Sequence, residues 1–534
     1  MIDLDRPSQP TIYYIDSAKP MKSASPGTLR NHAAVAVIFA SLCLATPVQA
    51  QWNSYAHDSE HSAQSQTASQ GLSRIHWQTP VDLNPRYSGN DLLIHYGSPL
   101  VTAANTIIVP VKTGARDGFR VDAHDGNNNG SLLWSQTTDY DLPAHGWTPV
   151  FGPVLTSAPR LYFPGAAGTV YYRDSPDAGT GSQVQLAFYG LSQYLATART
   201  RRAFQASVQI NTPLTSDSAG NIYFGFVVVP NRIMWPLYDS SGNQLSSGIA
   251  RISAGGQGTW TPVTTAAADS GMIEVVQNCA PAISKDGGVL YVAVSDGGAG
   301  YLVALNSATL APIARVRLKD PESGLDAILS DNGSASPTVG TDGDVYYGVL
   351  ENPCCAENHD RGWLLHFNSA LAQSKIPGAF GWDDTAALVP ARMVPSYTGS
   401  SSYLLMTKYN NYAGAGGNGL NKIAILDPNA TETDPVTGVT VMNEVLTILS
   451  PTPNPSLPGF TEWCINSAAV DPATKSVLAG NEYGILYRWD LTTNTLSQKV
   501  VLTTGVGEAY TPTVVAADGA VLAINNATLF VVGN

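Results

Sequence analysis

Charged side chains are scarce in this sequence. Only 13% of its 534 residues are Asp, Glu, Lys or Arg, and 41 acidic residues outnumber 28 basic ones. A net charge of −13 without an extended basic run argues against nucleic-acid binding and against adhesion to anionic membranes. The same charge suits a protein that must stay soluble after export.

Helical periodicity and several catalytic motifs are also missing. No long segment spaces its apolar residues as an amphipathic helix does, whereas glycine and proline are abundant, at 49 and 35 residues. This composition predicts a mostly β protein. The sequence has no C-x-x-C-H haem-attachment motif, G-x-S-x-G nucleophile elbow, Walker loop or zinc-protease helix. An attached c-type haem domain is therefore excluded, and any catalytic dyad must be assembled from distant parts of the chain.

The N-terminus carries the features of an export signal. Lys22 and Arg30 precede an apolar run over residues 33–45, and small residues ending at Ala50 offer a cleavage site. The run is too short to span a bilayer stably. We expect a signal peptide over residues 21–50, cleaved after Ala50. The mature chain is then periplasmic or secreted and has no transmembrane segment.

The other boundaries follow from the same sequence. Residues 1–20 do not look like the start of a signal, so they indicate an upstream mis-start, with Met21 as the true first residue. Residues 51–70 are polar and irregular and form an N-terminal arm. Residues 71–534 are expected to form a single propeller domain, because related segments recur through all of it.

Four cysteines remain in the mature chain. They are Cys279, Cys354, Cys355 and Cys464. Four cysteines in an exported protein suggest disulfides, and three pairings are possible. The adjacent Cys354 and Cys355 can form a vicinal bridge, which leaves Cys279 to pair with Cys464. The alternative is a crossed pairing that staples two loops together.

One phrase recurs along the chain. Residues 335–348 read ASPTVGTDGDVYYG: a small residue and proline, an apolar strand, an Asp-Gly turn, and a second apolar strand. Related phrases begin near Ser98, Gly152, Thr212, Ala280, Ser336, Met393, Asn466 and Thr511. A spacing of roughly 45–75 residues is typical of propeller blades. We therefore predict an all-β, eight-bladed β-propeller, or a seven-bladed one if the weak copy near Met393 is not a blade.

The two ends of the mature chain complement each other. Residues 75–81 form one expected strand without a local partner, whereas residues 511–533 supply about three strands and stop. A circular arrangement of sheets has to be closed, and a shared last blade removes the exposed edge. We therefore expect the strand around Trp77 to complete the blade that follows Tyr510.

These motifs resemble the pyrroloquinoline-quinone-like (PQQ-like) propellers. The polar lead-in over residues 52–64, with His57-Asp58 and His61, looks like that of many such proteins. The repeated strand with its Asp-Gly turn is similar as well, and so are the strand ends A-L-N at 304–306 and L-Y-R-W-D at 486–490. The T-G-x-x-x-W docking element of this family is largely missing, and residues 130–134 come closest to it.

The resemblance implies two different functions. The superfamily includes quinoprotein dehydrogenases and also a non-enzymatic propeller subunit of outer-membrane protein assembly. We expect an exported binding or scaffold protein in the cell envelope or outside the cell. Its partner would be an envelope protein or a small molecule, not nucleic acid. The alternative is an alcohol or sugar dehydrogenase that uses PQQ and calcium as cofactors.

The loop from Glu351 to Arg361 is the most unusual stretch, because it gathers charge in a chain that has little. The candidate cofactor-binding residues are Cys354, Cys355, Glu357, His359, Asp360 and Arg361. PQQ dehydrogenases place a vicinal disulfide against the cofactor ring, and this pair looks similar, although it falls later in the propeller. The loop either lines one mouth of the propeller's central channel or is a loop closed by a disulfide, with its charged side chains in water. Adjacent cysteines are poor ligands for a tetrahedral metal ion.

A second candidate site lies in a predicted hairpin. Asp125, Asn127 and Asn129 offer oxygen atoms at alternate positions and are followed by a glycine, as in the first half of a calcium-binding loop. The twelfth position is Gln136 and not a glutamate, so an ordinary polar turn is the alternative. The tryptophans expected near loops are candidate floors for a flat cofactor or else packing residues: Trp147, Trp235, Trp260, Trp382 and Trp463.

Overall fold

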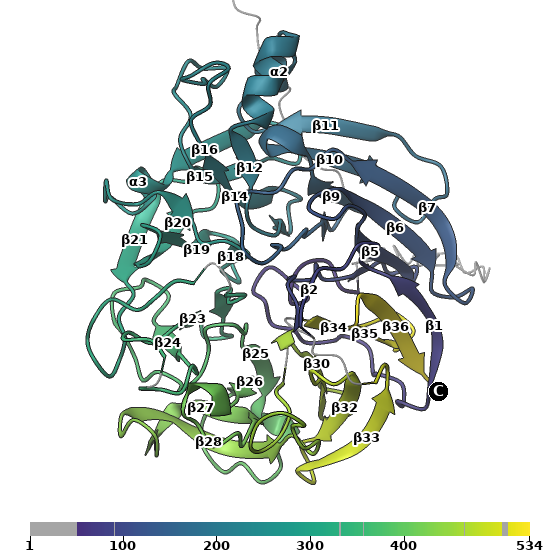
Figure 1. Ribbon diagram of the computed structural model, residues 1–534, viewed down its shortest axis with the longest axis vertical. Helices are drawn as coiled ribbons and strands as arrows, with labels where there is room; N and C mark the ends of the chain where they lie inside the picture. Colours follow the sequence, from purple (N-terminus) through teal and green to yellow (C-terminus); the bar gives the residue numbers. More distant parts are fainter. Residues whose placement is uncertain (1–50, 90, 331–332, 356, 464, 505–510) are drawn as a thin grey trace, which may run out of the picture. The chain divides into compact units, whose positions relative to one another are not determined.

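The computed structural model describes residues 51–534 except for positions 90, 331–332, 356, 464 and 505–510. The described residues form a ring of eight mostly antiparallel sheets, which confirms the prediction of an all-β, eight-bladed propeller (Figure 1). The expected mis-start and signal peptide lie outside the described residues and stay predictions.

The strands of the first seven sheets follow one another in chain order from the ring's axis outward, whereas the eighth sheet takes its outermost strand, β1, from the N-terminal part of the chain. The first blade consists of β4 (Leu100–Val101), β5 (Thr106–Lys112), β6 (Phe119–Asp125) and β7 (Ser131–Thr138), and the second of β8 (Val154–Leu155), β9 (Arg160–Pro164), β10 (Thr169–Asp174) and β11 (Gln183–Ala187). The third consists of β12 (Val208–Ile210) and β13 (Thr215–Ser216), which both pair with β14 (Ile222–Val228), followed by β15 (Gly248–Ile252) and β16 (Gly258–Pro262). The fourth consists of β17 (Glu274–Val275) and β18 (Ala282–Ile283), which both pair with β19 (Val289–Ser295), followed by β20 (Gly300–Asn306) and β21 (Pro312–Arg317). The last four are β22 (Thr338–Val339), β23 (Val345–Val349) and β24 (Trp363–Phe367); β25 (Ala387–Pro390), β26 (Tyr403–Tyr409), β27 (Lys422–Thr433) and β28 (Thr440–Leu449); β30 (Ala469–Asp471), β31 (Ser476–Gly480), β32 (Ile485–Asp490) and β33 (Thr495–Val501); and β34 (Thr511–Val515), β35 (Val521–Asn525), β36 (Thr528–Gly533) and β1 (Arg74–Pro80).

Smaller elements decorate this ring. The two-stranded sheet of β2 (Tyr87–Ser88) and β3 (Asp91–Leu92) stands apart, and β29 (Ile465–Ser467) pairs in parallel with β34. The helices are α1 (Leu191–Leu195), α2 (Ala198–Gln205) and α3 (Val263–Ala266). Neither α1 nor α2 was predicted from the sequence, because no long helical spacing of apolar residues marks them.

The recurring phrase forms the first two strands of each blade. In the fifth blade the Asp342-Gly343 turn joins β22 to β23, and Gly343 has a φ of 89°, a conformation that glycine adopts without strain. The weak copy of this phrase was predicted near Met393, a few residues after the strand that it stands for. The inner strand of the sixth blade is β25, and Met393 lies in the short 3-10 helix after it. A sixth blade therefore exists, and the count is eight and not seven.

The N-terminal strand closes the ring as predicted. β1 pairs antiparallel with β36, so that Trp77 lies opposite Val531 and Thr79 opposite Leu529. Figure 1 shows the first strand of the chain beside the last. β1 thus covers the outer edge of β36 and is the outermost strand of the eighth blade.

The arm at residues 51–70 runs through the middle of the ring and not along its edge. Inner strands of six blades donate a backbone N–H to a carbonyl of the arm, from Val101 to Trp52, Leu155 to Asn53, Ile283 to Ser59, Val339 to Glu60, Leu388 to Ser62 and Val470 to Ala63, over 2.7–3.0 Å. Its Trp52, Tyr55 and Ala63 are buried. The arm therefore fills the axis with its own backbone and apolar side chains.

Two polar side chains of the arm fix its path at the centre. The ring of His61 is fully buried, and its Nδ1–H donates to the carbonyl of Pro337 over 2.6 Å. Asp58 accepts from the His57 ring over 2.9 Å and from Ser62. The hydrogen bonds of His57, Asp58 and His61 therefore lie around the axis, because the arm threads the ring.

The Trp77 side chain of β1 packs closely against one glycine of the first blade, Gly130, and this contact gives a stability prediction. A Cβ atom at Gly130 would overlap the Trp77 indole, and Gly130 also has a φ of 69°. Gly438, with a φ of 75°, has open space around it and is the matched control. We expect Gly438→Ala to cost about 1–2 kcal/mol from the backbone alone. Gly130→Ala should cost about 1–3 kcal/mol more from overpacking. Thermal and urea unfolding of both variants measure this, and equal losses would show that Trp77 does not pack there.

Candidate functional site

Antiparallel topology brings two kinds of loop to the same mouth of the ring. In each blade, the loop that enters the innermost strand and the loop that joins the second and third strands lie at one end of the sheet. In the fifth blade the second kind is the loop from Glu351 to Arg361. In the sixth and seventh blades the first kind carries Trp382 to Asp384 and Glu462. This mouth is the candidate site.

Two charged residues of the fifth-blade loop hold the loop in shape. Glu351 is 1% exposed, and its two carboxylate oxygens accept from the backbone N–H groups of Asp360 and Gly362, each over 2.8 Å. The guanidinium of Arg361 forms two hydrogen bonds to Asp434, of 3.1 and 2.7 Å. Both side chains are thus engaged within the protein, so they position the loop and do not present free charges at the mouth.

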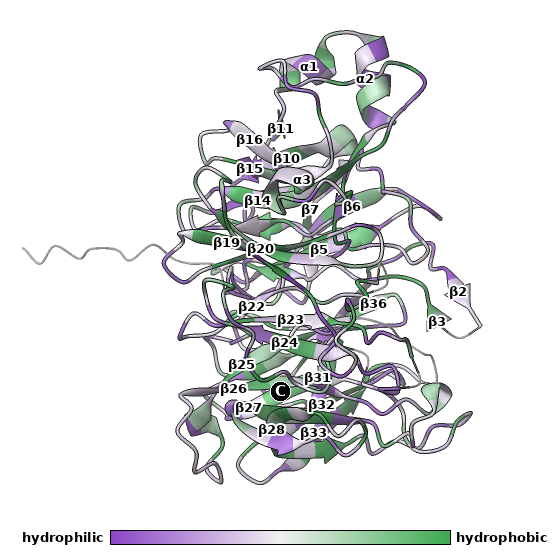
Figure 2. Cartoon of the chain, turned by 90° about the vertical axis from the view of Figure 1, so that its left-hand side faces the viewer, coloured by the Kyte–Doolittle hydropathy of each residue, from purple (hydrophilic) through white to green (hydrophobic). Residues whose placement is uncertain are grey.

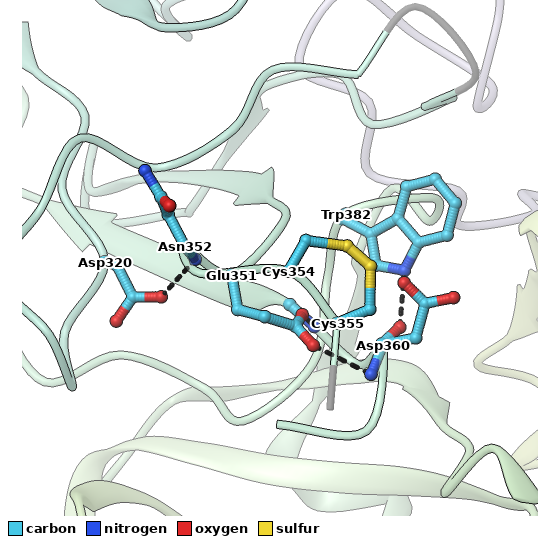
Figure 3. Close-up of a disulfide and its surroundings, with 8 residues drawn as sticks. Asp320, Glu351, Asn352, Cys354, Cys355, Asp360 and Trp382 are labelled. Atoms are coloured by element: carbon cyan, nitrogen blue, oxygen red, sulfur yellow. Dashed lines mark hydrogen bonds between the residues drawn. A yellow bond between two sulfur atoms is a disulfide. The ribbon is translucent and has the colours of Figure 1, made fainter. Parts of the chain in front are cut away.

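The cysteine pair lies beside an aromatic ring. The sulfur atoms of Cys354 and Cys355 are in direct contact, and Trp382 extends next to them (Figure 3). The indole Nε1–H of Trp382 donates to the Asp360 carbonyl over 2.7 Å. A loop from the fifth blade and a loop from the sixth therefore build one surface of sulfur atoms and an indole ring.

Carboxyl groups converge next to this surface. Burial, together with the charges of Glu351 and Asp383, raises the pKa of Asp360 to about 7. Asp383 is buried and accepts from the Lys408 ammonium over 2.6 Å. Its second oxygen, Oδ1, is buried without a hydrogen-bond partner among the described residues. The charge of Asp383 thus acts on Asp360 and on Lys408 at the same time.

Two more acidic side chains complete the cluster. Burial raises the pKa of Asp384 to about 6, although Asp384 accepts from Thr407 and from the Lys408 backbone. Burial, followed by repulsion from Glu482, raises the pKa of Glu462 to about 8, against the attraction of Lys408. We call Asp360, Asp383, Asp384, Glu462 and Lys408 the acidic mouth. Four carboxyl groups share one buried ammonium there, so negative charge exceeds positive charge whenever they ionise.

The other residues predicted for this loop do not join the acidic mouth. Glu357 is exposed. The ring of His359 contacts Asn411 of the sixth blade over 2.7 Å. The Cys354 and Cys355 sulfurs and an Asp360 carboxylate oxygen do lie within 4.8 Å of one another. Of the predicted loop residues, the structure thus brings Cys354, Cys355 and Asp360 together.

The predicted calcium residues lie away from this mouth, in the hairpin between β6 and β7. The side-chain amide of Asn127 donates to the Ala104 carbonyl over 2.9 Å, and its oxygen accepts from Asn105 over 3.2 Å. Asp125 Oδ1 accepts from the Asn127 backbone over 3.0 Å, and Asn129 has a φ of 51°. The alternative of a polar turn accounts for these bonds. Calcium at Asp125, Asn127 and Asn129 remains a prediction.

One predicted disulfide falls outside what the structure describes. Cys279 is buried in the ring, where burial raises the pKa of its thiol to about 12. Cys464 is not among the described residues, so the pairing of Cys279 with Cys464 stays a prediction.

The residues that sequence reasoning missed are Asp383, Asp384, Lys408 and Glu462. A usable signal existed, since Asp383, Asp384 and Glu462 all lie in the segments that lead into the inner strands of the sixth and seventh blades. In a propeller those positions face the axis whichever blade they come from. Trp382 had been singled out only as one of five tryptophans near loops.

Comparison with known proteins identifies the architecture. No protein-family model matches the chain, and no curated protein matches it either. A europium-containing methanol dehydrogenase superposes with a TM-score of 0.53 at 10% identity, covering 90% of this chain and 89% of the other. A quinohemoprotein alcohol dehydrogenase from Comamonas testosteroni gives 0.53 at 11% identity, covering 92% and 81%. The fold is that of the quinoprotein alcohol dehydrogenases. At such identities the likeness to these PQQ-like propellers concerns the fold alone.

Among the described residues, no helix is long and apolar enough to cross a bilayer.

The raised pKa values give a pH prediction. Glu462 binds its proton more tightly in the folded state, at a pKa of about 8, than in the unfolded chain, at about 4.5. Its contribution to stability is therefore complete below pH 4.5 and is lost as the pH rises through 8. Asp360 acts in the same direction. We expect the melting temperature to fall between pH 5 and 8.5, and to fall less in Glu462→Gln. Asp518→Asn, at an exposed position away from the mouth, should keep the wild-type slope.

Proposed function

We propose that this protein is an exported binding protein of the cell envelope or extracellular space, and that its acidic mouth binds a divalent cation. The observation that carries the proposal is the gathering of four carboxyl groups around Lys408. Without a cation, Asp360 and Glu462 retain protons near neutral pH, because burial and repulsion from neighbouring carboxylates raise their pKa values to about 7 and about 8. A bound cation would offset both costs.

The donor set favours a hard cation. The acidic mouth offers carboxylate oxygens, which suit Ca²⁺ and Mg²⁺ better than soft metals. Asp383 Oδ1 is buried without a described partner, so it supplies one oxygen at no loss of an existing bond. Asp360 and Glu462 would complete the set, and the charge of Asp360 acts on Glu462. The carboxylate oxygens of Asp360, Asp383 and Glu462 do not all lie within 4.8 Å of one another among the described residues, so a bound cation would have to draw them together.

Export supports a role outside the cytoplasm. The charged residues, apolar run and small residues before Gln51 have the order of a cleavable signal. We propose that Gln51 begins the mature protein, and that Cys354 and Cys355 are oxidised to a vicinal disulfide in that compartment. Sequencing the mature N-terminus and counting free thiols test these two points.

Calorimetric titration with Ca²⁺ and with Mg²⁺ tests the cation site. We expect 1:1 binding that is tighter at pH 8.5 than at pH 6 and that releases protons, because the carboxyl groups must ionise first. Asp360→Asn and Glu462→Gln should weaken binding at least tenfold, since each removes a charged ligand. Asp518→Asn, an acid-to-amide change elsewhere on the surface, should leave it unchanged. Binding that survives both mouth variants would refute the site.

A PQQ- and calcium-dependent alcohol or sugar dehydrogenase is the second candidate. It is favoured by the adjacent Cys354 and Cys355 beside Trp382, a surface suited to a flat ring. The charges fit less well. PQQ is an anion, and the cations described at this mouth, Lys408 and Arg361, are already paired with Asp383 and Asp434. The residues present thus do not fit the acidic groups of the quinone, and we derive no catalytic step through it.

The two candidates separate in one assay. The purified protein is incubated with PQQ and Ca²⁺, dialysed, and tested for quinone absorbance and for reduction of an artificial dye with alcohols and sugars. For a binding protein we expect neither signal, although Ca²⁺ still binds. Retained PQQ and dye reduction, both lost in Cys354→Ser/Cys355→Ser, would establish the dehydrogenase.

A further inference from the structure

A small helical insertion projects from the ring between the second and third blades. α1 and α2 connect β11 to β12; Figure 2 shows both helices outside the sheets, and Figure 1 shows α2 projecting from the ring. Thr197 caps α2 in a reciprocal pair with Thr200, and Phe204 stacks on Tyr189 at 4.6 Å between ring centroids. The insertion is therefore anchored at its base and presents its other side outward.

The outward side is basic in a chain that is acidic as a whole. Arg199, Arg201 and Arg202 on α2 are exposed, and so is Arg232 on the adjoining loop. From Asp177 to Asp239 the sequence contains only one further acidic residue, Asp217. The ion pairs found in the described part of the chain include none of these four arginines.

Apolar side chains are exposed in the same region. Leu195 is 44% exposed, Val229 46% and Trp235 39%. The loop that carries Val229 and Trp235 adjoins α2, because the Arg199 guanidinium donates to the Ile233 carbonyl over 2.8 Å and Asn231 donates to the Ala203 carbonyl over 3.2 Å. We call Leu195, Val229, Trp235 and the four arginines the arginine–aromatic tip.

We propose that the arginine–aromatic tip docks the protein on an anionic phospholipid surface. Arginines that pair with lipid phosphates, beside tryptophan and aliphatic side chains that enter the headgroup region, are the combination that binds such interfaces. The tip projects from the ring and is not a groove. This shape suits a flat bilayer better than it suits an inserted peptide.

The net charge of −13 does not prevent this docking. Repulsion between the acidic body and the membrane is screened over about 8 Å at physiological ionic strength. A helix of eight residues is about 12 Å long, and α2 points away from the ring. The body can therefore stay outside the screening distance while the arginines reach the phosphates. Its repulsion orients the protein with the tip toward the lipid.

Vesicle co-sedimentation of the full mature protein tests the proposal. We expect binding to vesicles of phosphatidylcholine with 30% phosphatidylglycerol, little binding to phosphatidylcholine alone, and release in 0.5 M NaCl. Arg201→Gln/Arg202→Gln should lower the partition coefficient about fivefold per arginine. Lys285→Gln/Lys499→Gln removes the same charge at exposed positions elsewhere and should change it little.

A second variant tests the apolar half of the tip. Leu195→Ser/Val229→Ser should weaken binding to the anionic vesicles several-fold and leave its salt dependence unchanged. Melting curves confirm that each variant is folded. Equal binding to neutral and anionic vesicles, or equal losses in the arginine and lysine variants, would overturn the proposal. So would self-association in solution that the tip variants abolish, since the surface would then serve a second copy of the chain.

Discussion

The threading of residues 51–70 through the axis is the interaction on which the rest of the structure depends. Inner strands of six blades each donate a backbone N–H to a carbonyl of the arm, so this one central segment connects blades that lie far apart in the sequence. Buried donors need partners, and without the arm these groups would face an open channel. The hydroxyl of Tyr55 extends the same role, because it reaches the Ser334 and Asn466 carbonyls and Thr385. The loops of the acidic mouth adjoin strands that the arm holds in place.

At the mouth, desolvation competes with ionisation. Burial favours the neutral form of each carboxyl group, and each neighbouring carboxylate adds to that preference. Lys408 offsets the charge of Asp383 but not that of the whole cluster. The protein keeps these acids together although apolar residues would pack there at lower cost. Such an arrangement is characteristic of functional sites, and here it adjoins the surface formed by the Cys354 and Cys355 sulfur atoms and the Trp382 indole ring.

The sequence predicted the ring well and the site only in part. Turn chemistry and repetition reveal blades, because Asp-Gly hairpins and buried strands recur at a blade's spacing, and the lone strand at Trp77 required a partner at the C-terminus. The acidic mouth could be recognised only from the three-dimensional structure. Asp360, Asp383 and Glu462 are separated by as many as 102 positions along the chain and meet only because the blades turn about one axis. The path of the arm was not predictable for a related reason, since nothing in a polar, irregular segment indicates that its carbonyls accept from inner strands of six blades.

The pairing of β1 with β36 has a consequence for biogenesis. The eighth sheet contains the first and the last strand of the described residues, and Gly71 donates to the side chain of Asn534. During synthesis, β1 leaves the ribosome hundreds of residues before its partner β36 emerges. Until then β1 is an unpaired edge, open to association with other chains. A chaperone that shields the nascent N-terminus would therefore matter more for the yield of this protein than one that acts on any middle blade.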